Sequence, residues 1–192
     1  MLEKFRSRIP VPDEKWQTYI RCFTPIHVPA RTILLAEGEI STKAYIIEKG
    51  AIRAYFNHNG DEITPQFFFE NQSIASIESF KKSIPSRVSL ETIEASALWW
   101  IDKKDLDWIL DEVMEIKAIR TVINDALLER TFHYMDHFVS FIRDTPEQRY
   151  LQLLEHSPHV VIRVPQHYIA SYLGVSSVHL SRIKAKITRK KA

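Results

Sequence analysis

The sequence predicts an α+β protein with an antiparallel β domain, then one long helix, then a small helical domain. Runs of strand-forming residues, punctuated by glycine, extend from about residue 26 to 101. After Ile101 the apolar period changes from two to about 3.6 residues. A Thr-Pro pair at 145–146 then restarts a helical pattern. We therefore expect domains at residues 1–110, 111–143 and 144–192.

The β domain is marked by glycines at three expected turns, Gly38, Gly50 and Gly60. Short runs rich in Ile, Tyr, Phe and Thr separate them, including "AYII", "AIRAYF" and "ITPQFFF". Asn59-Gly60 is a strong hairpin signal, because both central positions of a type I′ turn need a positive φ. The region from 26 to 101 is thus expected to form a barrel or sandwich of antiparallel strands.

One long helix is expected from Asp111 to Ile142, because this stretch contains no Gly or Pro and has apolar residues at spacings of three or four. At about 1.5 Å per residue it approaches ~45 Å, more than a small barrel needs for cover. We expect a second copy of the helix to pack on it, which makes the chain a homodimer. The expected dimer interface consists of Ile116, Ile119, Ile123 and Leu127.

The last domain begins with Thr145 as the N-cap and Pro146 at the first helical position. Between Gln166 and Ile187, two short helical patterns are separated by a tight turn at Gly174, which is typical of a helix-turn-helix. Ala170 is small where the helices would cross, and Val175, Leu180 and Ile183 are expected to face inward.

Charge is distributed unevenly along the chain. From Arg163 to Ala192 there are seven Lys/Arg and no acids, whereas residues 1–162 carry 19 Lys/Arg and 24 Asp/Glu. A basic block on an acidic body fits docking on a polyanion, although a solvated basic tail would have the same composition. In a helix-turn-helix the early turns of the second helix enter the major groove, and an Arg there can read guanine. Double-stranded DNA is therefore the expected partner, with Arg182 as the best base reader. The expected contact residues are Gln166, Ser176, Ser177, His179, Ser181, Arg182, Lys184 and Lys186.

The stretch "QHYIASYLGVSSVHLSRIKAKI" resembles the helix-turn-helix of the CRP/FNR family of bacterial transcription regulators, and "AEGEISTKAYIIEKGAIRAYFNHNGDE" is similar to the strands of their β-roll. The resemblance implies a cyclic-nucleotide-binding-like β-roll, a dimerisation helix and a C-terminal winged helix-turn-helix. It also implies a transcription regulator that binds a palindromic operator as a homodimer, with RNA polymerase as a further candidate partner. The connection "EHSPHVVIRVP" is short, so we expect a reduced wing.

The candidate effector pocket departs from the pattern of the nucleotide-binding relatives, in which a Gly-Glu pair holds the ribose and an Arg-Ser pair clamps the phosphate. Ala75-Ser76 stands at the first position and Ser86-Arg87 at the second. Side chains alternate along a strand, so an Arg displaced by one residue points to the other face. The pocket is therefore expected to be degenerate and not to bind cyclic AMP, and the effector is unknown.

Composition excludes several other classes. The single cysteine, Cys22, leaves no disulfide framework and no Cys-rich metal site. No apolar stretch has the length of a signal-peptide core or of a membrane span, so we expect neither a secreted nor a membrane-spanning protein. We expect a cytoplasmic protein without cofactor or metal. A cupin-like metal-dependent enzyme is the first alternative, but His27 and His58 are far apart in the strand region, and no catalytic motif is present. The second is a protein-interaction module whose basic tail is incidental.

Overall fold

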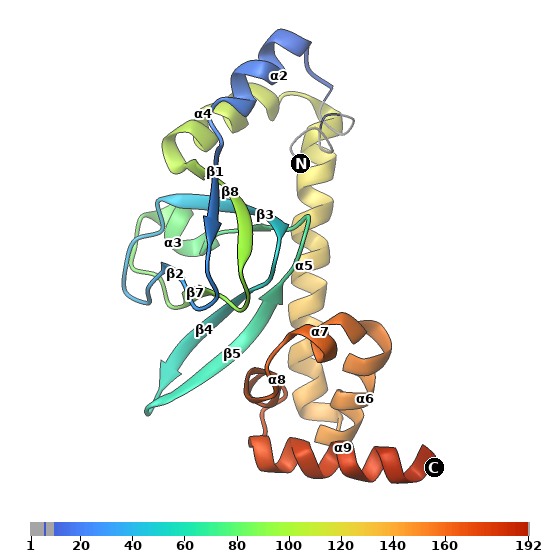
Figure 1. The fold of residues 1–192 in the computed structure, drawn as a ribbon. Helices are drawn as coiled ribbons and strands as arrows, with labels where there is room; N and C mark the ends of the chain where they lie inside the picture. Colours follow the sequence, from blue (N-terminus) through green and yellow to red (C-terminus); the bar gives the residue numbers. More distant parts are fainter. Residues whose placement is uncertain (1–5, 7–9, 192) are drawn as a thin grey trace.

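The computed structural model describes residues 6 and 10–191. Figure 1 shows a β-roll beside one long helix, with further helices packed at both ends of the roll. The long helix, α5 (Lys117–Arg143), runs from the helices above the roll to the C-terminal helical domain below it (Figure 1). The predicted order of β domain, long helix and helical domain is confirmed.

The roll consists of two four-stranded antiparallel sheets. The first has the order β1 (Thr24–Val28), β8 (Ser96–Asp102), β3 (Lys43–Lys49), β6 (Ser73–Ile74). The second has the order β2 (Ile33–Leu35), β7 (Ser89–Thr92), β4 (Ile52–His58), β5 (Asp61–Phe68). A short helix, α3 (Ile77–Lys82), follows β6.

The hairpin at Asn59-Gly60 forms as the sequence predicts. Both residues have positive φ, 54° and 92°, and His58 of β4 faces Asp61 of β5 across the turn. Between the two sheets the roll has a core of fully buried aliphatic side chains, with Ile47 and Ile52 at its centre.

The opposite face of the first sheet is covered by two helices, α2 (Asp13–Ile20) and α4 (Lys103–Val113). Trp16, Ile101 and Ile109 are buried together between them, and the start of α5 joins this cluster through Ile119. The roll is therefore enclosed on one side by helices from both ends of the β domain.

The predicted helix from Asp111 to Ile142 is wrong at its start. Residues 111–113 belong to α4, and the chain turns at residues 114–116 before α5 begins at Lys117. The amide of Ile116 donates a hydrogen bond to the carbonyl of Val113 at 3.0 Å in this turn. The apolar spacing in the sequence continues across this turn, because Val113 of α4 and Ile119 of α5 are buried in the same cluster.

The C-terminal domain contains α6 (Pro146–His156), α7 (Pro158–Arg163), α8 (Gln166–Tyr172) and α9 (Ser177–Lys191). Thr145 caps α6 as predicted, and its hydroxyl and the Gln148 side chain form a reciprocal capping box. No strand occurs within residues 144–191, so the described part of this domain has no wing hairpin. Across residues 6 and 10–191, no helix has the length and apolar character needed to span a bilayer.

Candidate nucleic-acid interface

Helices α8 and α9 form a helix-turn-helix. The turn contains Gly174 at φ 67°, and the amide of Val175 bonds back to the carbonyl of Ala170 at 3.0 Å. Ala170 is buried where the two helices meet. Leu180, Ile183 and Ile187 of α9 point into the core of the domain, as the spacing predicts for the first two.

Gly174 is required at this position for two reasons. Its φ is one that residues with a side chain rarely adopt, and a Cβ placed there would lie 2.6 Å from Cε1 of Phe141 on α5. The guanidinium of Arg149 on α6 also holds the turn, because it donates hydrogen bonds to the backbone carbonyls of Leu173 at 2.9 Å and Asp144 at 2.7 Å. The end of α5 and the turn are therefore held together by buried contacts.

The first turns of α9 face away from this core. The hydroxyl of Ser176 accepts a hydrogen bond from the amide of His179 at 3.2 Å and so caps the helix. Of the predicted contact residues on α9, the exposed ones are Ser177, His179, Ser181, Arg182 and Lys186. Val178, 62% exposed, adds an apolar group to the same turns.

Two of the predicted DNA-contacting lysines form hydrogen bonds or ion pairs with side chains of the same chain. Lys184 donates to Gln166 of α8 at 3.3 Å, which joins the two helices of the motif. Lys186 forms an ion pair with Glu147 of α6. Arg182 has no ion pair within the described residues, so no carboxylate there competes with a ligand for its guanidinium.

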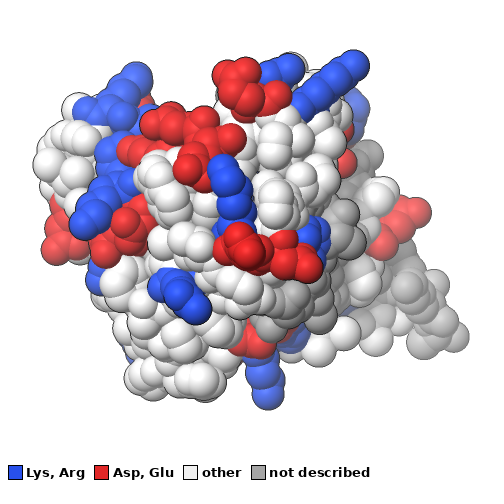
Figure 2. Space-filling view, turned by 90° about the horizontal axis from the view of Figure 1, so that it is seen from above, with Lys and Arg blue, Asp and Glu red and all other residues white. Residues whose placement is uncertain are grey.

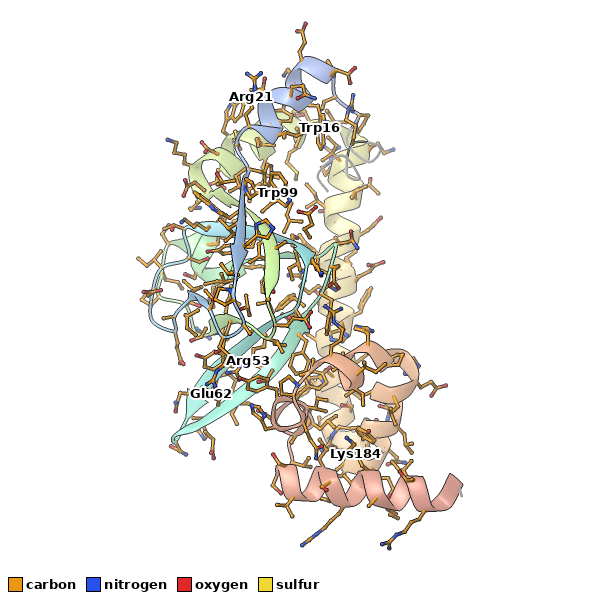
Figure 3. All side chains as sticks on the ribbon, viewed as in Figure 1. Trp16, Arg21, Arg53, Glu62, Trp99 and Lys184 are labelled. Atoms are coloured by element: carbon orange, nitrogen blue, oxygen red, sulfur yellow. The ribbon has the colours of Figure 1, made fainter. Side chains whose placement is uncertain are left out.

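Helix α9 lies across one end of the molecule, at the foot of α5 (Figure 1). Figure 3 shows Lys184 at this end and Arg21 at the opposite one. On the face seen from above in Figure 2, the end opposite α9, Lys and Arg lie close to Asp and Glu. By contrast, α9 carries only basic charges, so its end of the molecule is the one suited to a polyanion.

The helix-turn-helix is docked on the roll through α8 and β5. The hydroxyl of Ser171 accepts a hydrogen bond from the amide of Thr64 at 2.9 Å and donates one to the carbonyl of Glu62 at 2.8 Å. Beside them, the rings of Phe67 and Tyr172 have their centroids 5.2 Å apart. The roll therefore fixes the orientation of α8, and through the turn that of α9.

Sequence reasoning missed the residue at the centre of this contact, Arg53 of β4. It is 1% exposed and pairs with Glu91 of β7 at 2.6 Å. It also pairs with Glu62 of β5, which lies beside it in Figure 3. Its guanidinium lies 3.7 Å from the ring centroid of Tyr168 of α8. Arg53 and Glu91 are direct partners in the β4–β7 register. The sequence offered one signal for this buried pair: an Arg within an apolar strand and a Glu in the strand that pairs with it.

The residues of the candidate effector pocket do not come together as a set. Ser86 is buried, and its hydroxyl bonds to that of Ser76 at 2.9 Å. Arg87 points away, with its side chain 83% exposed and 3.7 Å from Glu78. Ala75 is partly buried beside Ser76. Both serine hydroxyls are thus used within the chain, and the arginine is in solvent.

The predicted dimer residues are divided between two surroundings. Ile119 is buried, and Ile116 and Ile123 pack against the cluster formed by α2 and α4 of the same chain. Leu127 is exposed. Because α5 begins later and lies against its own roll, the first part of the predicted stripe is used for folding the monomer.

The histidines form no cluster. His27 and His58 are exposed on strands of different sheets. The ring of His137 stacks on Tyr172 at 4.2 Å, and burial lowers the pKa of His137 to about 4. In the part of the chain that the structure describes, no group of three or more His, Cys, Asp or Glu side chains could hold a metal ion.

Comparison with known proteins agrees with this architecture. Residues 25–113 match the family model described as cyclic nucleotide-binding domain. No curated protein sequence matches the chain. Among solved structures, CLP of Xanthomonas campestris, described as a c-di-GMP responsive global regulator, has a TM-score of 0.73 at 16% identity, covering 94% of this chain and 93% of its own.

Two further structures are similar over most of the chain. FixK2 of Bradyrhizobium japonicum has a TM-score of 0.74 at 16% identity, with 88% and 86% of the two chains covered. A CooA mutant of Carboxydothermus hydrogenoformans has a TM-score of 0.71 at 13% identity, with 90% and 79% covered. At these identities the likeness establishes the fold.

The chain therefore has a CRP/FNR-like fold. Residues 25–113 match the cyclic nucleotide-binding domain model, and a long helix and a helix-turn-helix domain follow them.

Proposed function

We propose that this chain is a sequence-specific, DNA-binding transcription regulator. The observation that carries the proposal is α9, a second helix of a helix-turn-helix whose exposed early turns are polar and basic and which contains no acid. Short polar side chains followed by an arginine suit base-edge and phosphate contacts in a major groove. The regulators with the same fold support this reading.

We further propose a homodimer that binds a palindromic operator through α5. A stripe of exposed apolar side chains repeats along this helix at spacings of four, three, four and three: Leu128, Phe132, Met135, Val139 and Ile142. Such a repeat is typical of a helix that packs against a second helix. We propose it in place of the earlier part of the predicted stripe, because Ile119 is buried and Ile123 is partly buried against its own chain.

The test is selection of genomic fragments with the purified full-length protein, followed by titration of the recovered site against salt. Recovery of a palindrome whose affinity falls steeply with salt supports a dimeric regulator. Arg21→Ala is the matched control for Arg182→Ala, because Arg21 is an exposed arginine at the far end of the molecule (Figure 3). If no fragment binds more tightly than random DNA, the proposal of a sequence-specific regulator is contradicted and the protein-interaction alternative is favoured.

We infer that cyclic AMP is not the effector. The carboxylate expected at the ribose is replaced by the hydroxyl of Ser76, and Arg87 lies in solvent beside Glu78. A phosphate in this place would lack a charged partner, which is costly in a partly buried pocket. Isothermal titration tests the inference directly, and micromolar binding that Arg87→Ala abolishes would contradict it.

We further propose that the protein acts in the cytoplasm as a regulator and is not an enzyme. In the cupin-like alternative, barrel histidines converge on one metal. His27 and His58, which that alternative needs, lie on different sheets. RNA polymerase remains the second candidate macromolecular partner, to be tested by transcription from the selected site.

A further inference from the structure

A cavity of about 750 Å³ lies between α5 and the rest of the molecule. Its upper wall comes from α2 and α4, its side from α5, and its lower wall from the end of β5 and from α6 and α7. A hollow of this size suits a small organic molecule. None of the residues at the degenerate nucleotide pocket, Ala75, Ser76, Ser86 and Arg87, lines it, so it is a separate site.

Most of the lining is apolar. Aromatic rings from three different parts of the chain meet there, among them Trp16, Phe67 and Tyr172. On the α5 side, Val122 and Ala126 line the cavity yet are exposed, so the cavity opens to solvent along this helix. Apolar walls left open in this way favour a ligand with an apolar body.

The lining includes one arginine, Arg130, whose side chain is held in place by contacts with the roll. Arg130 of α5 donates a hydrogen bond to the carbonyl of Ser73 at 2.9 Å, and its guanidinium lies 5.4 Å from the centroid of the Phe68 ring. A guanidinium has five N–H groups, so this anchored side chain has further donors for an anionic group. His133, one turn further along α5, and His159 add polar groups to the lining.

We propose that this cavity binds an amphipathic organic monoanion, with its apolar body between α2, α4 and α5 and its anionic head at Arg130. A single guanidinium beside one exposed carboxylate, Glu129, matches one negative charge better than a polyanion. A nucleotide fits less well, because most of the wall around its ribose and base would be apolar. The proposal does not depend on DNA binding and is tested without DNA.

The experiment compares two fluorescent probes that share one aromatic body, the anion anilinonaphthalene sulfonate and the neutral phenyl naphthylamine. The full-length protein is expected to bind both and the sulfonate more tightly. Arg130→Gln should weaken the sulfonate about tenfold and leave the neutral probe unchanged. Arg120→Gln is the matched control, because Arg120 also donates one hydrogen bond to a backbone carbonyl of its own chain, that of Met114, but lies outside the cavity.

A second pair of variants separates the cavity from the exposed stripe of α5, which can also attract apolar dyes. Ala126→Trp fills the cavity from an exposed position and should abolish binding of both probes, as should Val122→Trp. Phe132→Ser, on the opposite face of α5, should leave both affinities unchanged. Circular dichroism confirms that each variant is folded.

Three results would overturn the proposal. The first is that neither probe binds the folded protein. The second is that binding survives both tryptophan variants but is lost in Phe132→Ser, which assigns it to the stripe. The third is that Arg130→Gln has no effect on the sulfonate, which removes the anionic head from the ligand class.

Discussion

Arg163 of α7 forms a bidentate ion pair with Glu70, two residues after β5, with Nη1–Oε2 and Nη2–Oε1 distances of 2.8 and 2.7 Å. The same guanidinium pairs with Glu94 after β7, and the carboxylate of Glu70 also accepts from the amide of Gly50 at 2.9 Å. This network links the C-terminal domain to the roll, in addition to the hydrogen bonds between Ser171 and β5. The orientation of the helix-turn-helix is thus set by polar contacts that can be tested one at a time.

The Glu70 pair makes stability depend on pH. Its hydrogen bonds with Arg163 are the largest cause that lowers the pKa of Glu70 from 4.5 to about 2. Because the folded-state pKa lies below the unfolded-state value, the stabilisation is complete above about pH 4.5 and is lost as the pH falls toward 2. In Glu70→Gln the urea midpoint should fall at pH 7 and change less between pH 7 and pH 3 than in the wild type. Glu155→Gln, an exposed acid on α6, is the control, and an identical pH profile for both variants would contradict the assignment.

Arg53 is expected to be one of the most sensitive positions in the roll. Arg53→Ala leaves Glu91 buried without its partner, which costs on the order of 3–5 kcal/mol in the free energy of unfolding. The double variant Arg53→Met with Glu91→Leu removes both charges and should recover most of that loss. Urea unfolding of the three proteins measures the effect. A double variant no more stable than the single one would show that packing against Tyr168, and not the buried charge, dominates.

The dimer surface can be tested at Phe132, near the middle of the exposed stripe and 57% exposed in the monomer. If two copies of α5 meet there, Phe132→Glu places a carboxylate in an apolar seam and should yield a folded monomer in sedimentation experiments. Its affinity for the selected palindrome should fall toward that for a half-site. Ile162→Glu on α7 is the control, because Ile162 is 82% exposed and lies away from the stripe. A dimeric Phe132→Glu protein would place the interface on another surface.

Two basic residues of α9 should contribute differently to DNA binding. Arg182→Ala should cost about 1–3 kcal/mol for the selected site and relax its base preference, because Arg182 is exposed and has no ion pair among the described residues. Lys186→Ala should weaken specific and random DNA alike and by less, because Lys186 is already paired with Glu147. Glu147→Gln should therefore raise the affinity for random DNA. Competition titrations measure all three, and equal losses on both DNAs for Arg182→Ala would exclude base reading.

Local features of this chain follow from the sequence because short-range geometry decides them. Two adjacent residues set the Asn59-Gly60 hairpin, and Thr145 with Pro146 and Gln148 sets the start of α6. The helix-turn-helix is equally local, since Gly174 and the inward residues of α9 lie within a short span. The resemblance carried by that span, together with the glycines of the roll, was sufficient for the fold class.

Tertiary structure decided which apolar residues serve folding and which remain exposed. Ile119 and Leu128 of α5 have the same character in the sequence, yet one is buried under α2 and α4 and the other faces solvent. The sequence could not show the turn at residues 114–116 or the pairing of Arg53 with Glu91, because both depend on segments far apart in the chain. The cavity beside Arg130 has the same origin, since its walls come from segments that only the folded chain brings together.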